Sequence, residues 1–421
     1  MKYLNIVSVF PALTETFVYR EIQSARRHGC EVVIAQLRDL NGPSASGFDD
    51  LRSTVVKARL WSASVLLGTF YFTGRKPRLW LGFLRMVLGS FPDTVSALKL
   101  AYILTVSIGL AYRLRNSGIS HVRGHHLHSE AVASMFIGGL LELPYNFTCH
   151  TVKTYYPRGV IRETIRRASF VLANIDQVKR FLIEQGADPG RVHLVRGGVS
   201  LPAFPLHDAE PREDPSVILA VGRFDAKKGF DVLLSACSIL RDRKVRFRCV
   251  LIGDGDEWGE LVAMRRATGL EAHVQMPGSL TFDKVRQWHR RAALLAVPSV
   301  LAADGSTDGL PTVIIEAFAC GVPVIGSAVG GIPDAIQDRV NGFLVKPGDA
   351  DELANRIEVL LKDRELRLKF VHEARRTAEC EFDLDRNVQS LIGLMQDSQT
   401  GLIQGGARLL PPAPQPIREA R

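Results

Sequence analysis

Two acidic residues, Asp308 and Glu316, stand on either side of an expected helix start in the second half of the chain. Pro311 suits the first turn of that helix, and Gly321 suits its C-terminal cap. Exposed N–H groups at a helix start attract anions because the helix dipole lies behind them. Those groups belong to Leu310, Thr312 and Val313. A diphosphate could bind there while the two carboxylates hold the hydroxyl groups of a sugar, although acids also favour helix starts for structural reasons alone.

Two cations lie in a loop that follows an expected strand. The strand over 216–222 ends at Gly222, and Arg223 and Lys228 follow it before the next helix. Ligands of α/β proteins bind at the carboxyl ends of the strands, where these two side chains project. We therefore predict that Arg223 and Lys228 clamp a diphosphate in the same layer as the helix start near Pro311.

The order of the surrounding elements indicates the fold class. Apolar, β-branched runs alternate with amphipathic helical stretches, which is typical of α/β proteins with parallel sheets. We expect strands at 3–10, 31–36, 119–123, 145–149, 169–173, 216–222, 247–252, 272–276, 293–297 and 322–326. A stretch at 201–215 with four prolines and five charges separates two such series. We predict Rossmann-like domains at 1–205 and 206–383, a helix at 384–399 and a disordered tail at 400–421.

The composition is that of a folded protein. Of the 421 residues, 46% are hydrophobic and 23% are charged, which excludes disordered and collagenous classes. Six scattered cysteines form no C-x-x-C pair, so we predict a reducing, cytoplasmic location. The start of the chain lacks a signal-peptide cleavage site. The longest apolar stretch, 13 residues between Lys99 and Arg113, is shorter than the roughly 20 that span a bilayer, so we expect no transmembrane helix.

The positive charge is concentrated in the first half of the chain. Residues 1–200 hold 25 Lys or Arg against 13 acids, whereas 201–421 hold 28 against 31. The first half therefore suits an anionic partner, either a membrane surface or a nucleic acid, but no nucleic-acid motif is present and we expect no such partner. Segment 75–91 interleaves cations with Trp80, Phe83 and Leu84, as an interfacial helix does. A basic helix packed on its own domain would show the same pattern.

A set of motifs between about residues 190 and 350 resembles a known family. In order along the chain these are Gly222-Arg223-x4-Lys228-Gly229, Leu251-Ile-Gly253-Asp-Gly255, Pro277-Gly278, Asp308-x7-Glu316 and Val329-Gly-Gly-Ile-Pro333. Their combination resembles the retaining nucleotide-sugar glycosyltransferases of the GT-B fold, in the group 1, family 4-like set. The segments 10–21 and 124–128 resemble the bacterial branch of that family that builds exopolysaccharides such as colanic acid.

The resemblance implies a role for each matching residue. Arg223 and Lys228 would neutralise the donor diphosphate, Glu316 would hold the ribose, and Asp308 would contact hydroxyl groups of the donor sugar. The family usually has Glu where this chain has Asp308, and the shorter side chain bears on donor preference. His150 matches a histidine of the family near the reactive face of the sugar. Further donor contacts are implied at Gly253, Gly278, Gly309, Leu310, Pro311 and Thr312, and acceptor contacts at Thr14, Glu15, Thr16, His126 and His128.

The resemblance also implies the reaction. A GT-B enzyme has two facing Rossmann-like domains, binds acceptor and donor in the cleft between them, and has a C-terminal helix that crosses back to the first domain. It would move a hexose from a nucleoside diphosphate to a glycan or lipid-linked acceptor with retention of configuration, without metal or cofactor, in the cytoplasm or peripherally at the membrane. Two other functions stay open: a nucleotide-sugar epimerase of the same fold, and a non-catalytic protein that binds sugar nucleotides or membranes.

Three other interpretations of single motifs are weaker. Gly253, Gly255 and Gly259 approximate a dinucleotide-binding pattern, but the acid expected about 20 residues later is missing. Asp254 and Asp256 could bind a divalent metal, although a turn explains them as well. A zinc site is incomplete because Glu130 is the only nearby acid and no cysteine is close. The residues concerned are His121, His125, His126 and His128.

Overall fold

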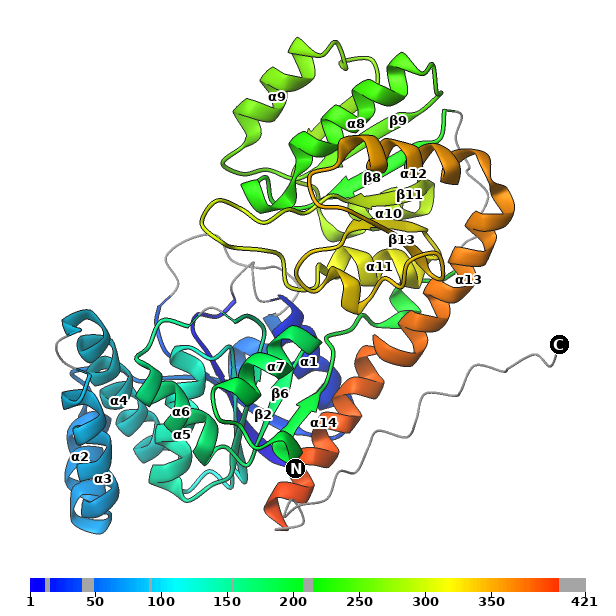
Figure 1. Cartoon of the computed structure of the whole chain (residues 1–421). Coiled ribbons are helices and arrows are strands. Elements are labelled where there is room, and N and C mark those ends of the chain that lie inside the picture. The colour runs from blue at the N-terminus through cyan, green and yellow to red at the C-terminus, as the bar shows by residue number, and fades with distance from the viewer. Residues whose placement is uncertain (12–15, 40–48, 91–92, 153, 207–214, 401–421) are drawn as a thin grey trace. The chain divides into compact units, whose positions relative to one another are not determined.

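A computed structural model describes the chain except for residues 12–15, 40–48, 91–92, 153, 207–214 and 401–421. The chain divides into two compact units (Figure 1). The first comprises Met1–Gly197 together with the C-terminal helix from Asp385 onward, and the second comprises Gly198–Leu384. The tail predicted at 400–421 lies almost wholly outside the described residues.

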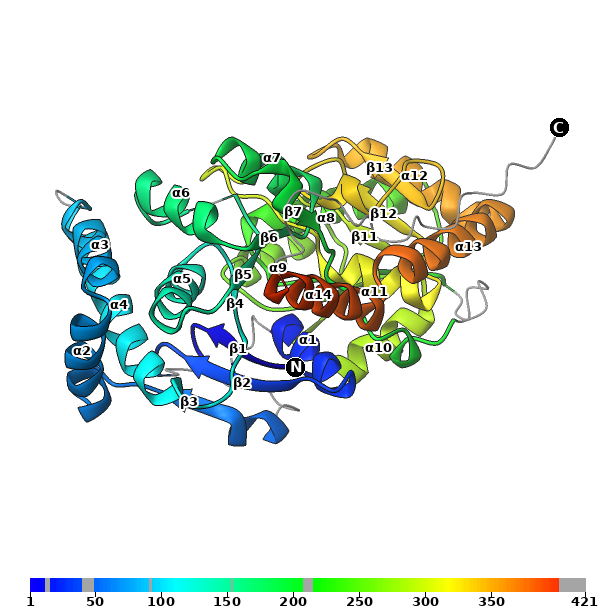
Figure 2. The ribbon, with the colours of Figure 1, turned by 90° about the horizontal axis from the view of Figure 1, so that it is seen from below.

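The first unit is built on a seven-stranded parallel sheet with the strand order β3-β2-β1-β4-β5-β6-β7. Figure 2 shows these strands in order from bottom to top. Strands β4 to β6 are buried along their whole length, as expected for a parallel sheet covered on both faces. The strands are β1 (Lys2–Val7), β2 (Glu31–Gln36), β3 (Val55–Lys57), β4 (His121–His125), β5 (Tyr145–Cys149), β6 (Phe170–Ala173) and β7 (Val192–Leu194).

Helices cover this sheet and connect its strands. Helix α4 begins where the Asp93 carboxylate accepts a hydrogen bond from the Ser96 N–H at 3.1 Å. Helix α14 packs on α1, since Asp385 accepts from the Ser24 hydroxyl and from the Arg27 guanidinium. The helices are α1 (Thr16–Arg27), α2 (Ala63–Arg75), α3 (Pro77–Leu88), α4 (Thr94–Leu114), α5 (Ser129–Leu141), α6 (Arg158–Arg167), α7 (Asp176–Glu184) and α14 (Leu384–Gln399).

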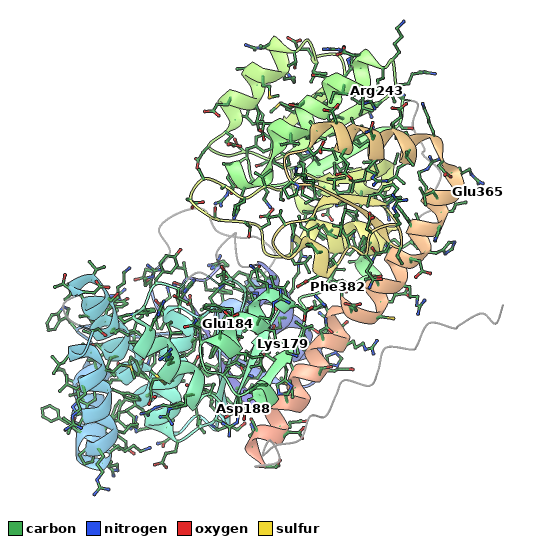
Figure 3. All side chains as sticks on the ribbon, in the orientation of Figure 1. Lys179, Glu184, Asp188, Arg243, Glu365 and Phe382 are labelled. Atoms are coloured by element: carbon green, nitrogen blue, oxygen red, sulfur yellow. The ribbon has the colours of Figure 1, made fainter. Side chains whose placement is uncertain are left out.

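The second unit repeats the topology with a six-stranded parallel sheet, β10-β9-β8-β11-β12-β13. Buried apolar side chains fill both faces of this sheet, and Phe382, labelled in Figure 3, is among them. The elements are β8 (Val217–Val221), α8 (Phe230–Asp242), β9 (Arg248–Ile252), α9 (Trp258–Ala267), β10 (Val274–Gly278), α10 (Phe282–Arg291), β11 (Ala292–Val297), α11 (Thr312–Cys320), β12 (Val324–Ser327), β13 (Gly342–Val345), α12 (Ala350–Lys362) and α13 (Arg364–Glu381).

In both units the strand order reverses beside the first strand, between β1 and β4 and between β8 and β11. Adjacent loops leave the sheet in opposite directions at such a point, and ligands of α/β proteins bind in the crevice that results. The topology therefore places a candidate site in each unit. In the first unit the loops after β1, β4 and β5 contribute, and in the second unit those after β8, β9 and β11.

The predicted α/β class with parallel sheets is confirmed, and strands β2 and β5 have the predicted bounds. The short strands β3, β7 and β13, of three or four residues each, were not predicted. The 13-residue apolar stretch between Lys99 and Arg113 is part of a longer helix. Helix α4 has 21 residues and is long and apolar enough to cross a membrane, but 61% of its apolar window is buried inside the protein, as in a core helix.

Candidate functional site

The loop after β8 brings a lysine to the carboxyl edge of the second sheet. Gly229 ends this loop with φ of 62°, in the left-handed region that favours glycine. A Cβ atom there would lie 2.1 Å from the Pro298 carbonyl oxygen, so only glycine lets this loop lie against the end of β11. Lys228, which precedes it, is thereby held beside the residues that follow β11.

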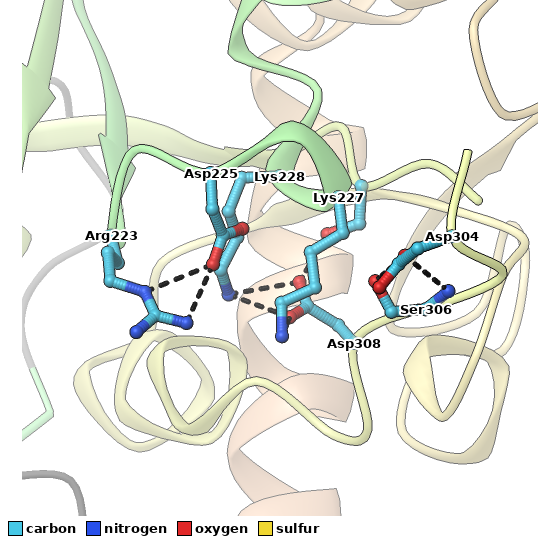
Figure 4. A network of polar contacts seen from close by, with 8 residues as sticks. Arg223, Asp225, Lys227, Lys228, Asp304, Ser306 and Asp308 are labelled. Atoms are coloured by element: carbon cyan, nitrogen blue, oxygen red, sulfur yellow. Dashed lines mark hydrogen bonds and ion pairs between the residues drawn. The ribbon is translucent and has the colours of Figure 1, made fainter. Parts of the chain in front are cut away.

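Lys228 forms an ion pair with Asp308. Its Nζ lies 2.9 Å from Oδ1 and 3.0 Å from Oδ2 of the carboxylate (Figure 4). The Ser299 hydroxyl donates a hydrogen bond to Oδ2 at 2.6 Å, and Lys227 Nζ lies 4.0 Å from Oδ1. Asp308 is only 6% exposed, so its charge is compensated by these partners rather than by water. The structure thus brings together two of the predicted site residues, Lys228 and Asp308.

Arg223 forms an ion pair with a neighbour in its own loop. Its Nε and Nη2 lie 3.1 and 2.9 Å from Oδ2 of Asp225, and Figure 4 shows the guanidinium pointing to that carboxylate. The Arg223 side chain is 67% exposed, whereas that of Lys228 is largely buried. The two predicted clamp residues therefore share one loop, but only Lys228 contacts Asp308.

Helix α11 starts one residue later than we predicted. Pro311 is the N-cap of α11 rather than part of its first turn, and no side chain caps the helix in the described part of the chain. The N–H groups of the first turn are thus open to an anion, and Thr312 is exposed. The C-terminal end is as predicted, because Gly321 caps α11 with φ of 73°.

The loop from Asp308 to Leu310 is fastened to the glycine-rich segment after β12. The Gly331 N–H donates to the Gly309 carbonyl oxygen at 3.0 Å. Gly330 lies so close that a Cβ atom would be 1.9 Å from the Asp308 carbonyl oxygen. Glycines at these positions therefore fix the backbone that carries Asp308, which gives a physical reason for the motif at 329–333.

Glu316 lies inside α11 and is buried. Its Oε2 lies 3.9 Å from Nε2 of His289, which is on α10 and is fully enclosed. Burial lowers the pKa of His289 to about 4, so this imidazole is neutral at pH 7. Glu316 therefore lies beside a neutral ring.

Gly253 and Gly278 shape the backbone at the ends of β9 and β10. The Gly253 N–H donates to the Gly278 carbonyl oxygen at 3.1 Å. A Cβ atom on Gly253 would lie 1.8 Å from the Gly222 carbonyl oxygen, whereas one on Gly278 would meet nothing within 4 Å. Gly253 thus allows close contact of the loops after β8 and β9, and Gly278 serves a left-handed turn with φ of 78°.

The candidate site of the first unit is a cluster of rings. His150, which follows β5, has its ring 4.8 Å from those of both Phe17 and His126, measured between centroids. His126 follows β4 with φ of 59°, a left-handed conformation that is uncommon without glycine. The His128 ring lies 6.0 Å from that of His126 and 4.8 Å from that of Tyr155. The structure therefore brings His126, His128 and His150 together.

These histidines are neutral at physiological pH. Burial, with the nearby His126 ring and Arg123, lowers the pKa of His150 well below 6.5. Burial beside His128 lowers the pKa of His126 to about 4. His150 Nε2 and His128 Nδ1 have no hydrogen-bond partner among the described residues, so they can still bond to a ligand. Within the same residues no three His, Cys, Asp or Glu side chains form a group that could hold a metal ion.

A buried arginine positions the strands that carry these rings. Arg123 on β4 pairs with both carboxylate oxygens of Glu21 at 2.8 and 2.9 Å. It also donates to Asn146 at 3.2 Å and to Thr148 at 2.8 Å, both on β5. This network joins α1 to the strands that precede His126 and His150. Of the predicted acceptor residues, Thr14 and Glu15 lie outside the described residues, and Thr16 is the first residue of α1.

Sequence reasoning missed three residues of the sites. Ser299 holds Asp308, Asp225 holds Arg223, and His289 lies beside Glu316. Ser299 could have been found, since it follows β11 at the carboxyl edge where ligands bind. His289 could not, because only the packing of α10 on α11 reveals its neighbour.

Comparison with known proteins agrees with this geometry. Residues 206–377 match the family Glycosyl transferases group 1. An amylovoran biosynthesis glycosyltransferase of Erwinia amylovora is 32% identical over 48% of this chain and 50% of its own length. A putative colanic acid biosynthesis glycosyltransferase is 29% identical in Escherichia coli, over 55% of this chain and 58% of that protein. The protein of the same name from Salmonella typhimurium is 25% identical over 94% of this chain and 100% of its own length. The chain thus spans about half the length of the first two relatives.

Solved structures share the whole fold. HepE of Anabaena, in complex with UDP, superposes with a TM-score of 0.72 and 18% identity over 94% of this chain and 99% of that one. Sucrose-phosphate synthase of Thermosynechococcus elongatus superposes with a TM-score of 0.70 and 18% identity, over 95% of this chain and 100% of that one. Two doubly wound units with a ligand edge each define a protein of the GT-B fold. More specifically, this chain carries a glycosyl transferases group 1 domain, as its motifs predicted.

Proposed function

We propose that this protein transfers a hexose from a nucleoside diphosphate sugar to a glycan or lipid-linked acceptor in exopolysaccharide synthesis. The observation that carries the proposal is the Lys228–Asp308 pair at the point where the second sheet reverses its strand order. A cation held by an acid at this edge suits a ligand that has both a diphosphate and sugar hydroxyl groups. The group 1 domain supports a transferase rather than a protein that only binds sugar nucleotides.

The donor diphosphate would bind between Lys228 and the open start of α11. Negative charge gathers on the nucleoside diphosphate as it leaves, and a fixed ammonium group with aligned N–H groups stabilises that charge most in the transition state. A resident cation of this kind can serve in place of a divalent metal, so we propose a reaction that needs none. Arg223 would reach the same phosphates after leaving Asp225.

The two acids would hold the hydroxyl groups of the donor. Glu316, which is buried inside α11 beside His289, would hold the ribose. Asp308 would accept hydrogen bonds from the transferred sugar while Ser299 and Lys228 fix its carboxylate. Because Asp308 is one methylene shorter than the Glu of the family and is tied to two partners, we expect it to reach fewer sugar hydroxyls.

We propose that transfer retains the configuration of the sugar. The bond from the anomeric carbon to the diphosphate oxygen breaks, and the acceptor oxygen bonds to that carbon on the same face. The acceptor proton passes to the leaving phosphate oxygen, so no enzyme nucleophile is required. The neutral His150 ring, which adds no positive charge, would lie against the reacting sugar and donate or accept a hydrogen bond.

The names of relatives support the substrate classes. HepE has been solved with UDP-glucose as well as with UDP, and the three relatives named above carry names of exopolysaccharide synthesis. The basic, apolar helices of the first unit further suggest work at a membrane surface, where lipid-linked acceptors are found.

A binding screen followed by a product assay tests the proposal. The purified chain is heated with UDP, GDP and ADP in the presence of a chelator. A ligand at 100 times its dissociation constant adds about 2.7 kcal/mol to the free energy of unfolding. We expect one nucleotide to raise the melting temperature, less so in Lys228→Ala. Transfer from the matching sugar nucleotide is then followed by NMR of the anomeric proton. Stabilisation by no nucleotide, or turnover that needs no acceptor and yields an epimer, would overturn the proposal.

A further inference from the structure

The largest exposed apolar side chains are concentrated on one helical segment of the first unit. Among the described residues, ten of the 17 exposed large hydrophobic residues fall within 60–98, which is less than a tenth of the chain. Trp61 is 96% exposed and Phe70 is 80% exposed. Single exposed apolar residues are ordinary, but a cluster of this size marks an interaction surface.

The apolar residues follow the periodicity of the helices and form outer stripes. On α2 the buried face is Val65, Gly68 and Phe72, and Gly68 lets the helix pack closely on α4. Leu66, Leu67 and Phe70 face away from that contact. These side chains thus add nothing to the core of the unit.

Helix α3 repeats this arrangement. Phe83, which we expected on the interfacial face, is buried against Phe136 of α5 instead, with 4.6 Å between ring centroids. Leu81, Leu84 and Leu88, at spacings of three and four residues, form the exposed stripe. The packing of α3 thus separates the inward Phe83 from the outward leucines.

Cations surround these stripes. Residues 59–99 contain six Lys or Arg and a single acid, Asp93, which caps α4. Arg59, Arg78 and Arg85 form no ion pair within the described part of the chain, and Arg75 lies over the Tyr71 ring at 4.2 Å. Leucine and aromatic residues bordered by arginine are the composition of segments that lie in the interface of an anionic bilayer.

The stripes are also placed where a bilayer could reach them. Helices α2 and α3 lie at the outer edge of the first unit, on the side of its sheet away from α14, in both views (Figures 1 and 2). The chain enters this segment directly from the carboxyl end of β3, where Arg38, Lys57, Arg59 and Leu60 line a pocket. The apolar segment is thus continuous with the ligand edge of the first sheet.

We propose that the outer face of α2, α3 and the first turns of α4 binds the surface of an anionic phospholipid bilayer. The leucine, phenylalanine and tryptophan side chains enter the headgroup region, and Arg59, Arg78 and Arg85 contact lipid phosphates. A second copy of the chain is a poorer occupant, because two segments that each hold six Lys or Arg against one acid repel each other. The inference adds a partner to the proposed function and rests on a surface remote from Lys228 in sequence.

Vesicle co-sedimentation of the full chain tests this inference. We expect binding to vesicles of phosphatidylcholine mixed with phosphatidylglycerol, weak binding to phosphatidylcholine alone, and weaker binding as salt is raised. The double variant Phe70→Gln with Leu84→Gln should lower the partition coefficient about tenfold or more. Arg78→Gln with Arg85→Gln should remove the preference for anionic vesicles. Val359→Gln, an exposed apolar residue of the second unit, is the matched control and should bind like the parent.

Two further readouts separate the outcomes. Melting temperatures must stay within a few degrees of the parent, as expected for exposed positions. Stabilisation by nucleotide, measured without lipid, reports on the donor site and should be unchanged in every surface variant. Equal binding to both vesicle types, binding to neither, or self-association in ultracentrifugation that Phe70→Gln abolishes would each overturn the anionic bilayer as partner, whatever the fate of the proposed transferase.

Discussion

The ligand edges of the two sheets have the same topology, but one carries charged side chains and the other neutral rings. In the second unit, Lys228 and Asp308 face each other as full charges at the reversal between β8 and β11. In the first unit, the loops after β4 and β5 carry His126 and His150, whose pKa values burial has lowered so that both rings are neutral. Neither edge resembles the other in side-chain chemistry.

Strand order therefore fixes where a ligand binds but not which ligand it is. The doubly wound topology supplies the crevice and the loop directions in both units. The side chains placed on those loops then divide the work: fixed charges suit a diphosphate, while neutral aromatic rings suit the uncharged face of a sugar. If this division is correct, substitutions in the two units should fail in different ways.

Removing the Lys228 charge should have the largest effect. We expect Lys228→Ala to lower the turnover number by about 10² to 10³, as for the loss of one group that stabilises transition-state charge. Asp308 also loses its closest cation, so the melting temperature should fall. Steady-state kinetics with the identified donor measures the first effect. Lys227→Ala is the matched control, because its Nζ is 4.0 Å from Asp308, and a loss as large as that of Lys228→Ala would contradict the assignment.

Removing the His150 ring should cost less and leave donor binding intact. We expect His150→Ala to lower turnover by about ten- to a hundredfold, because a misplaced sugar reacts more slowly even when it is bound. Stabilisation by the nucleoside diphosphate should be unchanged, since the charged site lies in the other unit. His193→Ala serves as the control in the same sheet. Weaker nucleotide binding by His150→Ala would break the proposed division of labour.

The sequence revealed the charged site better than the neutral one. Lys228 and Asp308, which the structure brings together, were both predicted from motifs that combine a charge with a nearby glycine. The ion pair of Arg223 with Asp225 could not be identified, since the contacts of an exposed, flexible arginine depend on the exact loop geometry. The fold class followed from the alternation of strands and helices.

The cluster of neutral rings in the first unit could be found only in the structure, because the residues that bury these rings are far apart in the sequence. His150 was identified by resemblance, but its contact with Phe17 joins residues more than 130 positions apart. The same holds for the outer stripes of α2 and α3: the sequence indicated a basic, apolar helix, and only packing separated the buried Phe83 from the exposed Leu84.

The neutral histidines should make the first unit the more sensitive to acid. A histidine whose folded pKa is below its unfolded value stabilises the protein above about pH 6.5, and this contribution falls by up to about 1.4 kcal/mol per pH unit below it. His121, His126 and His150 lie in the first unit with lowered pKa values, to about 3 for His121 and about 4 for His126. Hydrogen exchange between pH 7.5 and 5 should show α5 losing protection before α11, and the reverse order would contradict the comparison.

Substitution of Arg223 should have the smallest effect on nucleotide binding, and substitution of its partner Asp225 should have the opposite effect. Because the side chain is exposed and paired with Asp225, we expect Arg223→Ala to weaken nucleotide binding only about three- to tenfold. Asp225→Asn releases the guanidinium, so it should tighten binding by a similar factor if Arg223 must leave Asp225 to reach the phosphates. The double variant should then bind like Arg223→Ala, because the benefit of releasing Arg223 requires Arg223. Titration calorimetry of all three variants measures this, and additive effects in the double variant would mean that Asp225 acts on the site without Arg223.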